Sequence, residues 1–216
     1  MKNTIQSRFL KAALLGVAGL LLSAATTFAQ NFHVLIDTSA LNLPVNSSSA
    51  PFAIDFQLNS GDTLNNNTAV INNFTFGGGG GPFGSTNLFG GASGGLPGTI
   101  TLSDTFAFNE FFQSFTFGTS LAFDVSLTQN VDAGPTPDGF SIAILDSNFA
   151  NIPTNGLGDS LLAMNANTGT VLGAGTGTFE GVSVLVTPIP EPSTYSLLAG
   201  VVALVGVWRR RSICRA

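Results

Sequence analysis

A strict two-residue alternation at residues 121–128 constrains the fold of this chain most. Four apolar side chains alternate there with four small or polar ones, namely Leu121, Phe123, Val125 and Leu127 with Ala122, Asp124, Ser126 and Thr128. Successive side chains of an extended strand point to opposite faces, so this pattern predicts a strand with one face buried.

Other segments of the same character precede and follow this strand. They are residues 32–37, 52–58, 69–76, 100–102, 106–117, 140–145, 161–165 and 179–186. Residues 106–117 and 121–128 are expected to pair as a hairpin through the turn Gly118–Ser120. About nine short strands, with no convincing helix between them, predict an all-β domain, an antiparallel and jelly-roll-like β-sandwich over residues 30–187.

Two stretches within this domain have loop composition. Residues 77–98 contain eleven glycines, but a phosphate-binding loop would require a lysine that this stretch lacks. We therefore predict a flexible surface loop at 77–98, and a second loop at residues 167–178.

The charges are divided between the ends and the middle of the chain. All seven basic residues lie near the two ends, namely Lys2, Arg8, Lys11, Arg209, Arg210, Arg211 and Arg215. Residues 30–190 hold eleven acidic residues and no Lys or Arg, which excludes nucleic acid as a partner because phosphate binding needs cationic side chains. The single cysteine, Cys214, leaves this span without a disulfide, so packing must hold the fold together.

The N-terminus has the organisation of a signal peptide. Lys2, Arg8 and Lys11 precede an apolar run over residues 12–25, and small residues end at Ala29. This order predicts a helical signal peptide over residues 1–29, cut by signal peptidase between Ala29 and Gln30.

The C-terminus is predicted to be a second targeting segment, over residues 188–216. Pro190, Glu191 and Pro192 precede an uncharged stretch at 195–208, and a basic tail follows at 209–215. As a helix the stretch would rise about 21 Å against a hydrocarbon core of about 30 Å. Its flanks favour a transmembrane helix, because the prolines stop backward extension and a membrane anchor follows, made of Trp208, Arg209, Arg210 and Arg211.

This tripartite C-terminus resembles the PEP-CTERM sorting signal of Gram-negative bacteria. The resemblance implies an exosortase substrate that is held transiently in the inner membrane, cleaved at or near residues 190–192, and delivered to the cell surface or extracellular matrix. It also implies an association with exopolysaccharide and biofilm. Residues 115–127 resemble the ectodomain of one PEP-CTERM subgroup of unassigned function, which brings no active site.

Enzymatic chemistry finds little support in the sequence, and we expect no catalytic residues and no cofactor. The sole histidine, His33, is expected to be an ordinary strand residue rather than part of a catalytic triad. A glycosidase needs only two carboxylates, and the first pair to consider would join Glu110 to Asp104 or Asp124. Glycan cleavage therefore stays open as a third alternative.

Calcium is the metal that the loops could bind. Carboxylate, amide and carbonyl oxygens are its preferred ligands, and the loops at 59–67 and 132–138 offer Asp62, Asp132 and Asp138. Neither loop has EF-hand spacing. The favoured function is a non-enzymatic surface or matrix protein, and the main alternative is a calcium-assisted carbohydrate-binding sandwich.

Overall fold

Thirteen strands form two sheets in the computed structural model, which describes residues 29–42, 50–62, 64–130, 136–152, 160–175, 182–190 and 200. The six strands of the first sheet are β1 (Ala29–Asp37), β3 (Thr68–Phe76), β6 (Gly91–Gly94), β7 (Ile100–Ser103), β9 (Ser120–Thr128) and β13 (Ser183–Ile189). The seven strands of the second sheet are β2 (Ala53–Asn59), β4 (Gly81–Pro82), β5 (Asn87–Phe89), β8 (Phe108–Thr116), β10 (Gly139–Leu145), β11 (Leu162–Asn165) and β12 (Thr170–Ala174).

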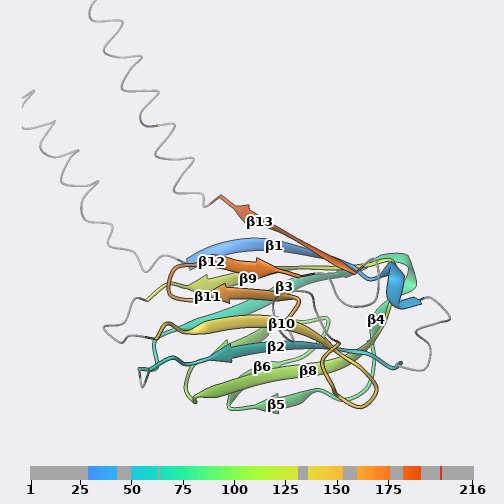
Figure 1. The fold of residues 1–216 in the computed structure, drawn as a ribbon, viewed down its shortest axis with the longest axis horizontal. Coiled ribbons are helices and arrows are strands. Elements are labelled where there is room, and N and C mark those ends of the chain that lie inside the picture. The colour runs from blue at the N-terminus through green and yellow to red at the C-terminus, as the bar shows by residue number, and fades with distance from the viewer. Residues whose placement is uncertain are drawn as a thin grey trace, which may run out of the picture.

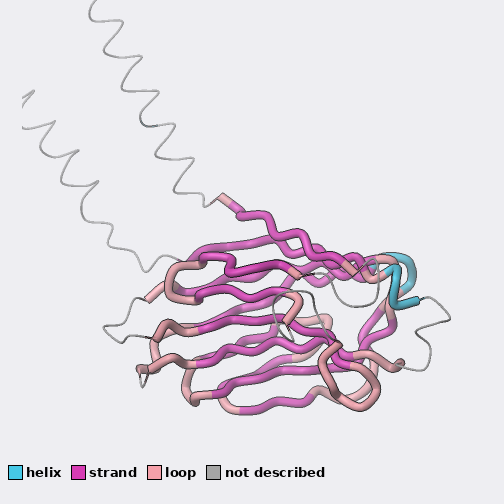
Figure 2. Tube along the Cα trace, in the orientation of Figure 1, coloured by secondary structure: helices cyan, strands magenta, loops and turns pink. Residues whose placement is uncertain are grey.

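The order of the strands is non-sequential in both sheets. The first sheet runs β13–β1–β9–β3–β7–β6, and the second runs β12–β11–β10–β2–β8–β4 with β5 also paired to β8 (Figure 1). Each pairing among the described strands is antiparallel. Loops gather at the strand ends, where the short 3-10 helices η1 (Ser39–Asn42) and η3 (Gly77–Gly79) also lie (Figure 2). The prediction of an all-β antiparallel sandwich is confirmed.

The core lies between the two sheets and is rich in phenylalanine. The four apolar residues of β9 that alternate in sequence are all fully buried, as the alternation predicts for an inward face. Phe56 on β2 packs edge to face against Phe123 on β9, with ring centroids 5.2 Å apart. Phe74 and Phe111 extend this aromatic contact along the two sheets.

The predicted hairpin between residues 106–117 and 121–128 is wrong. β8 pairs with β2, whereas β9 lies between β1 and β3 in the other sheet. Hydrogen bonds from other segments hold the connection, because Thr119 N donates to Gly77 O (3.0 Å) and Thr38 Oγ1 donates to Gly118 O (2.9 Å). Gly118 carries the chain from one sheet to the other, and a Cβ there would collide with the Gly77 carbonyl.

The glycine-rich stretch 77–98 contains η3 and three strands, so its prediction as a loop is corrected. β6 pairs with β7, while β4 and β5 pair with β8. Two buried amide side chains of β8 hold the stretch: Asn109 Oδ1 accepts from Gly91 N (2.8 Å), and Gln113 Oε1 accepts from Leu96 N (3.0 Å). Side-chain hydrogen bonds from another strand therefore compensate for the weak strand propensity of glycine.

Two further boundaries differ from the prediction. β12 occupies part of the stretch 167–178 that was predicted as a loop, and it pairs with β11. β13 continues to Ile189, which lies opposite Asn31 of β1. The predicted domain limit at residue 187 therefore falls inside the last strand.

Candidate functional site

A pair of carboxylates lies on the outer face of the seven-stranded sheet. The register of β2 and β8 places Gln57 opposite Glu110. Gln57 Nε2 donates to Asp55 Oδ2 at 2.7 Å and to Glu110 Oε1 at 3.3 Å. One amide group therefore bridges the two acids.

The environment of this pair favours a bound proton. Asp55 is 1% exposed, and its Oδ1 has no hydrogen-bond partner. Burial and the negative charge of Glu110 raise the pKa of Asp55 to about 7, against the opposing effect of the hydrogen bond from Gln57. Burial also raises the pKa of Glu110. Near neutral pH such a pair can hold one proton, the arrangement on which general acid–base catalysis depends.

The sequence suggested Glu110 with Asp104 or Asp124 as a first pair to consider, and the structure brings neither of these two acids beside it. Asp124 lies on the outer face of the other sheet, and Asp104 lies at the end of the sandwich beside Asn67. The sequence feature that could have pointed to Asp55 was its outward position in the alternating strand at 52–58. Strand order, which the sequence did not reveal, decided that this strand lies next to Glu110.

Three phenylalanine rings form a row next to the carboxylate pair. Phe89 stacks nearly parallel on Phe112 with ring centroids 6.4 Å apart, and the ring centroid of Phe149 lies 5.4 Å from that of Phe112. Phe89 is 52% exposed and Phe149 is 60% exposed, and Phe89 lies opposite Glu110 in the β5–β8 register. Phe112 between them is partly buried. Exposed rings beside polar groups are typical of a binding surface.

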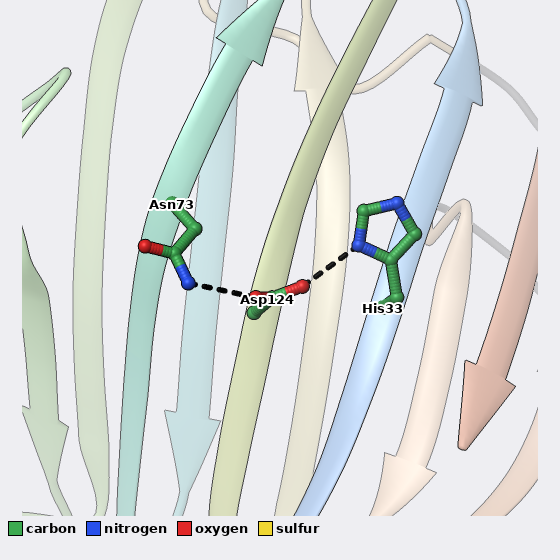
Figure 3. Close-up of polar contacts among 3 residues, drawn as sticks. All are labelled: His33, Asn73 and Asp124. Atoms are coloured by element: carbon green, nitrogen blue, oxygen red, sulfur yellow. Dashed lines mark hydrogen bonds and ion pairs between the residues drawn. The ribbon is translucent and has the colours of Figure 1, made fainter. Parts of the chain in front are cut away.

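The six-stranded sheet carries a different polar group on its outer face (Figure 3). His33 Nδ1 lies 2.7 Å from Asp124 Oδ1, and Asn73 Nδ2 donates to Asp124 Oδ2 at 2.8 Å. Burial alone would raise the pKa of Asp124, but the hydrogen bonds from Asn73 and His33 outweigh it and hold that pKa below its usual value. Within the described ranges no serine hydroxyl bonds to His33, so the residues of a Ser–His triad are not brought together there.

The calcium candidates are separated by the structure. Asp138 is buried and accepts from Gly61 N (2.6 Å) and Asn67 Nδ2 (2.7 Å). Asp62 is partly exposed and accepts from Leu64 N (2.6 Å), and Asp132 lies outside the described residues. Across the part of the chain that the structure describes, no three His, Cys, Asp or Glu side chains group as a metal site.

The C-terminal strand leads directly into the predicted sorting segment. β13 ends at Ile189, opposite Asn31 near the start of β1, so the two ends of the ectodomain lie side by side (Figure 1). Pro190 follows without an intervening linker. The predicted cleavage point between Ala29 and Gln30 likewise falls at the first residue of β1.

Comparison with known protein families identifies this C-terminal segment. The family model of the PEP-CTERM protein-sorting motif matches residues 188–211. The chain carries a PEP-CTERM sorting motif. No curated protein and no solved structure matches the chain.

The PEP-CTERM motif implies a secreted protein with a C-terminal membrane-anchoring sorting signal, surface display, and processing by an exosortase. It begins at Pro188, within β13. Most of the segment lies outside the described residues, including Glu191, Pro192, Trp208, Arg209, Arg210 and Arg211. Apart from Ala29 and Gly200, the predicted signal peptide at 1–29 and transmembrane helix at 195–208 also lie outside them. The described residues contain no helix long and apolar enough to cross a membrane.

Proposed function

We propose that the β-sandwich is a non-enzymatic component of an extracellular polysaccharide layer, delivered there after exosortase processing in a Gram-negative cell. The observation that carries this proposal is the PEP-CTERM motif at residues 188–211. Its three parts act in order: Pro190 to Pro192 is recognised, the helix at 195–208 holds the precursor in the inner membrane, and the arginines remain on the cytoplasmic side.

The charge of the product supports a role outside the cell. Cleavage of the signal peptide before Gln30 and of the C-terminal segment near Pro190 removes every Lys and Arg. The remaining domain contains eleven acidic residues and no Lys or Arg, and it has no cysteine that could form a disulfide. Such a surface repels anionic nucleic acid and favours partners that are neutral or that bind through cations.

The sorting step is tested by replacing Pro190, Glu191 and Pro192 with alanine. We expect uncleaved precursor in the inner-membrane fraction, detected by immunoblotting of fractionated cells. The matched control is Pro188→Ala, which removes a nearby proline but keeps the triplet and should be processed normally. Normal release of the triple variant would contradict the proposed role of the triplet.

The matrix role is tested by locating the mature protein. We expect it to sediment with the exopolysaccharide and to enter the soluble fraction when that polysaccharide is enzymatically degraded. Recovery of all the protein from cell-free medium, with the polysaccharide intact, would contradict this part of the proposal while leaving the sorting step unaffected.

Carbohydrate binding is the second candidate function, and the ring row Phe89–Phe112–Phe149, with its two exposed outer rings, favours it. Aromatic faces can pack on the apolar faces of sugar rings, while Glu110 and Gln57 beside the row can hydrogen-bond to hydroxyl groups. Phe149→Ala should weaken binding of the exported protein to its own purified polysaccharide. Phe83→Ala is the control, since Phe83 is 47% exposed but belongs to no ring contact of this row.

Glycan cleavage remains the competing interpretation of the carboxylate pair. The proposed non-enzymatic role predicts that the purified protein releases no reducing sugar from that polysaccharide. Release that disappears in Glu110→Gln would contradict the proposal and would assign Glu110 a catalytic role.

A further inference from the structure

A second carboxylate cluster lies at one end of the sandwich, where three segments of the chain meet. Asp104 directly follows β7, Asn67 directly precedes β3, and Asp138 directly precedes β10. The first two segments belong to the six-stranded sheet and the third belongs to the seven-stranded sheet. All three side chains are buried, with exposed fractions of 3% for Asp104, 1% for Asn67 and 1% for Asp138.

The hydrogen bonds of this cluster use most of its oxygen atoms. Asp104 Oδ2 accepts from the backbone amides of Asn66 (3.1 Å) and Asn67 (2.8 Å). Both carboxylate oxygens of Asp138 accept hydrogen bonds, from Gly61 N and from Asn67 Nδ2. Asp104 Oδ1 is buried and accepts no N–H hydrogen bond, while the Asp104 carboxyl group lies within hydrogen-bonding reach of that of Asp138. A buried carboxylate oxygen without a donor is costly.

The two carboxylates are close enough to affect each other. Burial raises the pKa of Asp104, the amides of Asn67 and Asn66 oppose this, and the neighbouring Asp138 raises it further. No Lys or Arg occurs anywhere in residues 30–190, so no such side chain of the exported domain can neutralise the pair. A buried pair of like charges requires a proton or a metal ion.

Backbone carbonyl oxygens also lie close to Asp138 in the chain. The loop at 60–62 crosses the segment at 136–138 so closely that a Cβ at Gly61 would collide with the carbonyl oxygens of Thr136 and Pro137. Two backbone carbonyls therefore lie at the same crossing as Asp138. Carboxylate and carbonyl oxygens without nitrogen or sulfur donors are the ligands of hard cations, and Ca²⁺ tolerates the irregular geometry that loops provide.

We propose that Asp104 and Asp138 bind one Ca²⁺ ion, with Asp104 Oδ1 as a direct ligand and with carbonyl oxygens and water completing the coordination. The ion links the end of β7 to the start of β10 and so joins the two sheets. Its role is structural, because this cluster is separate from the Asp55–Glu110 pair and from the phenylalanine row. With only two carboxylates, the affinity is that of extracellular calcium modules, with a Kd of about 10⁻⁴–10⁻³ M.

The test uses the full exported chain in a non-ionic detergent. Thermal unfolding is followed by circular dichroism, because the only Trp and Tyr, Trp208 and Tyr195, lie in the C-terminal segment and report poorly on the sandwich. We expect 10 mM CaCl₂ to raise Tm by about 5 °C relative to EDTA. Calorimetric titration should give one Ca²⁺ per chain.

The decisive variant is Asp104→Asn, because the side-chain oxygen of asparagine can still accept the hydrogen bonds from the backbone amides of Asn66 and Asn67. In EDTA it should match or exceed the wild-type Tm, since one of two like charges is gone, and its calcium response should fall below about 1 °C. Asp146→Asn is the matched control, because Asp146 Oδ1 also accepts from two backbone amides, of Asn148 and Ala150, but Asp146 is partly exposed. It should keep the full calcium response.

Two outcomes would overturn the proposal. A wild-type chain with the same Tm in calcium and EDTA, and without binding heat, would show that a proton shared by the two acids neutralises the cluster instead. An undiminished calcium response in Asp104→Asn would place the ion elsewhere. If that variant does not fold, the wild-type titration still decides between calcium and a proton.

Discussion

The rings of Phe56 and Phe123 meet edge to face across the two sheets, with their centroids 5.2 Å apart. Phe56 comes from β2 and Phe123 from β9, and both side chains are completely buried. Edge-to-face contact is a favoured geometry of aromatic pairs because the positive ring edge meets the negative ring face. This contact joins the sheets in a domain that has no disulfide to do so.

Phe123→Ala should lower the free energy of unfolding by about 3–5 kcal/mol, because it leaves a cavity between the sheets and removes contacts with both Phe56 and Phe74. Urea unfolding followed by circular dichroism measures the change. Phe83→Ala, at a half-exposed position, should cost less than about 1 kcal/mol. Equal losses in the two variants would show that the contact between the sheets is not central to stability.

Gly118→Ala should destabilise the domain by about 1–3 kcal/mol, because the new Cβ would collide with the carbonyl group of Gly77 where the chain crosses between sheets. Gly139→Ala is the matched control, since a Cβ at Gly139 meets no atom within 4 Å. The control should be within about 1 kcal/mol of wild type, or slightly more stable. Tolerance of alanine at Gly118 would contradict the close approach to Gly77.

Asp55 should make the stability of the domain fall as pH rises. Its pKa is raised from 3.8 to about 7 in the folded protein, so between these values the folded state binds the proton that the unfolded state has lost. The contribution of protonated Asp55 is fully present below about pH 4 and is lost as pH rises toward 7, with a slope of at most about 1.4 kcal/mol per pH unit.

Asp55→Asn should remove this slope and raise the free energy of unfolding at pH 8 by about 2–4 kcal/mol relative to wild type. The measurement is the difference between variant and wild type in urea unfolding at pH 4, 6 and 8, which cancels the titration of the other acids. Glu110→Gln should reduce the slope without abolishing it, because burial is the larger cause of the raised pKa. An identical pH profile for Asp55→Asn and wild type would contradict the raised pKa.

Much of the fold could be predicted from local patterns. The strand at 121–128 is β9 with all four alternating apolar residues inward, and the strands at 32–37 and 52–58 are β1 and β2 within a few residues. The strands within the glycine-rich stretch 77–98 could not be predicted from local patterns. Its strands depend on hydrogen bonds from Asn109 and Gln113, which come from a strand more than ten residues further along the chain.

The sequence by itself determined the fold class, the C-terminal sorting motif and the absence of Lys and Arg from residues 30–190. These properties depend on composition and on short-range periodicity, which a single strand expresses without its neighbours. Tertiary structure alone decided that β8 and β9 belong to different sheets, that Gln57 bridges Asp55 and Glu110, and that Asp104 lies beside Asp138. Those relationships follow from strand order and register, and both are set by packing between residues that lie far apart in the chain.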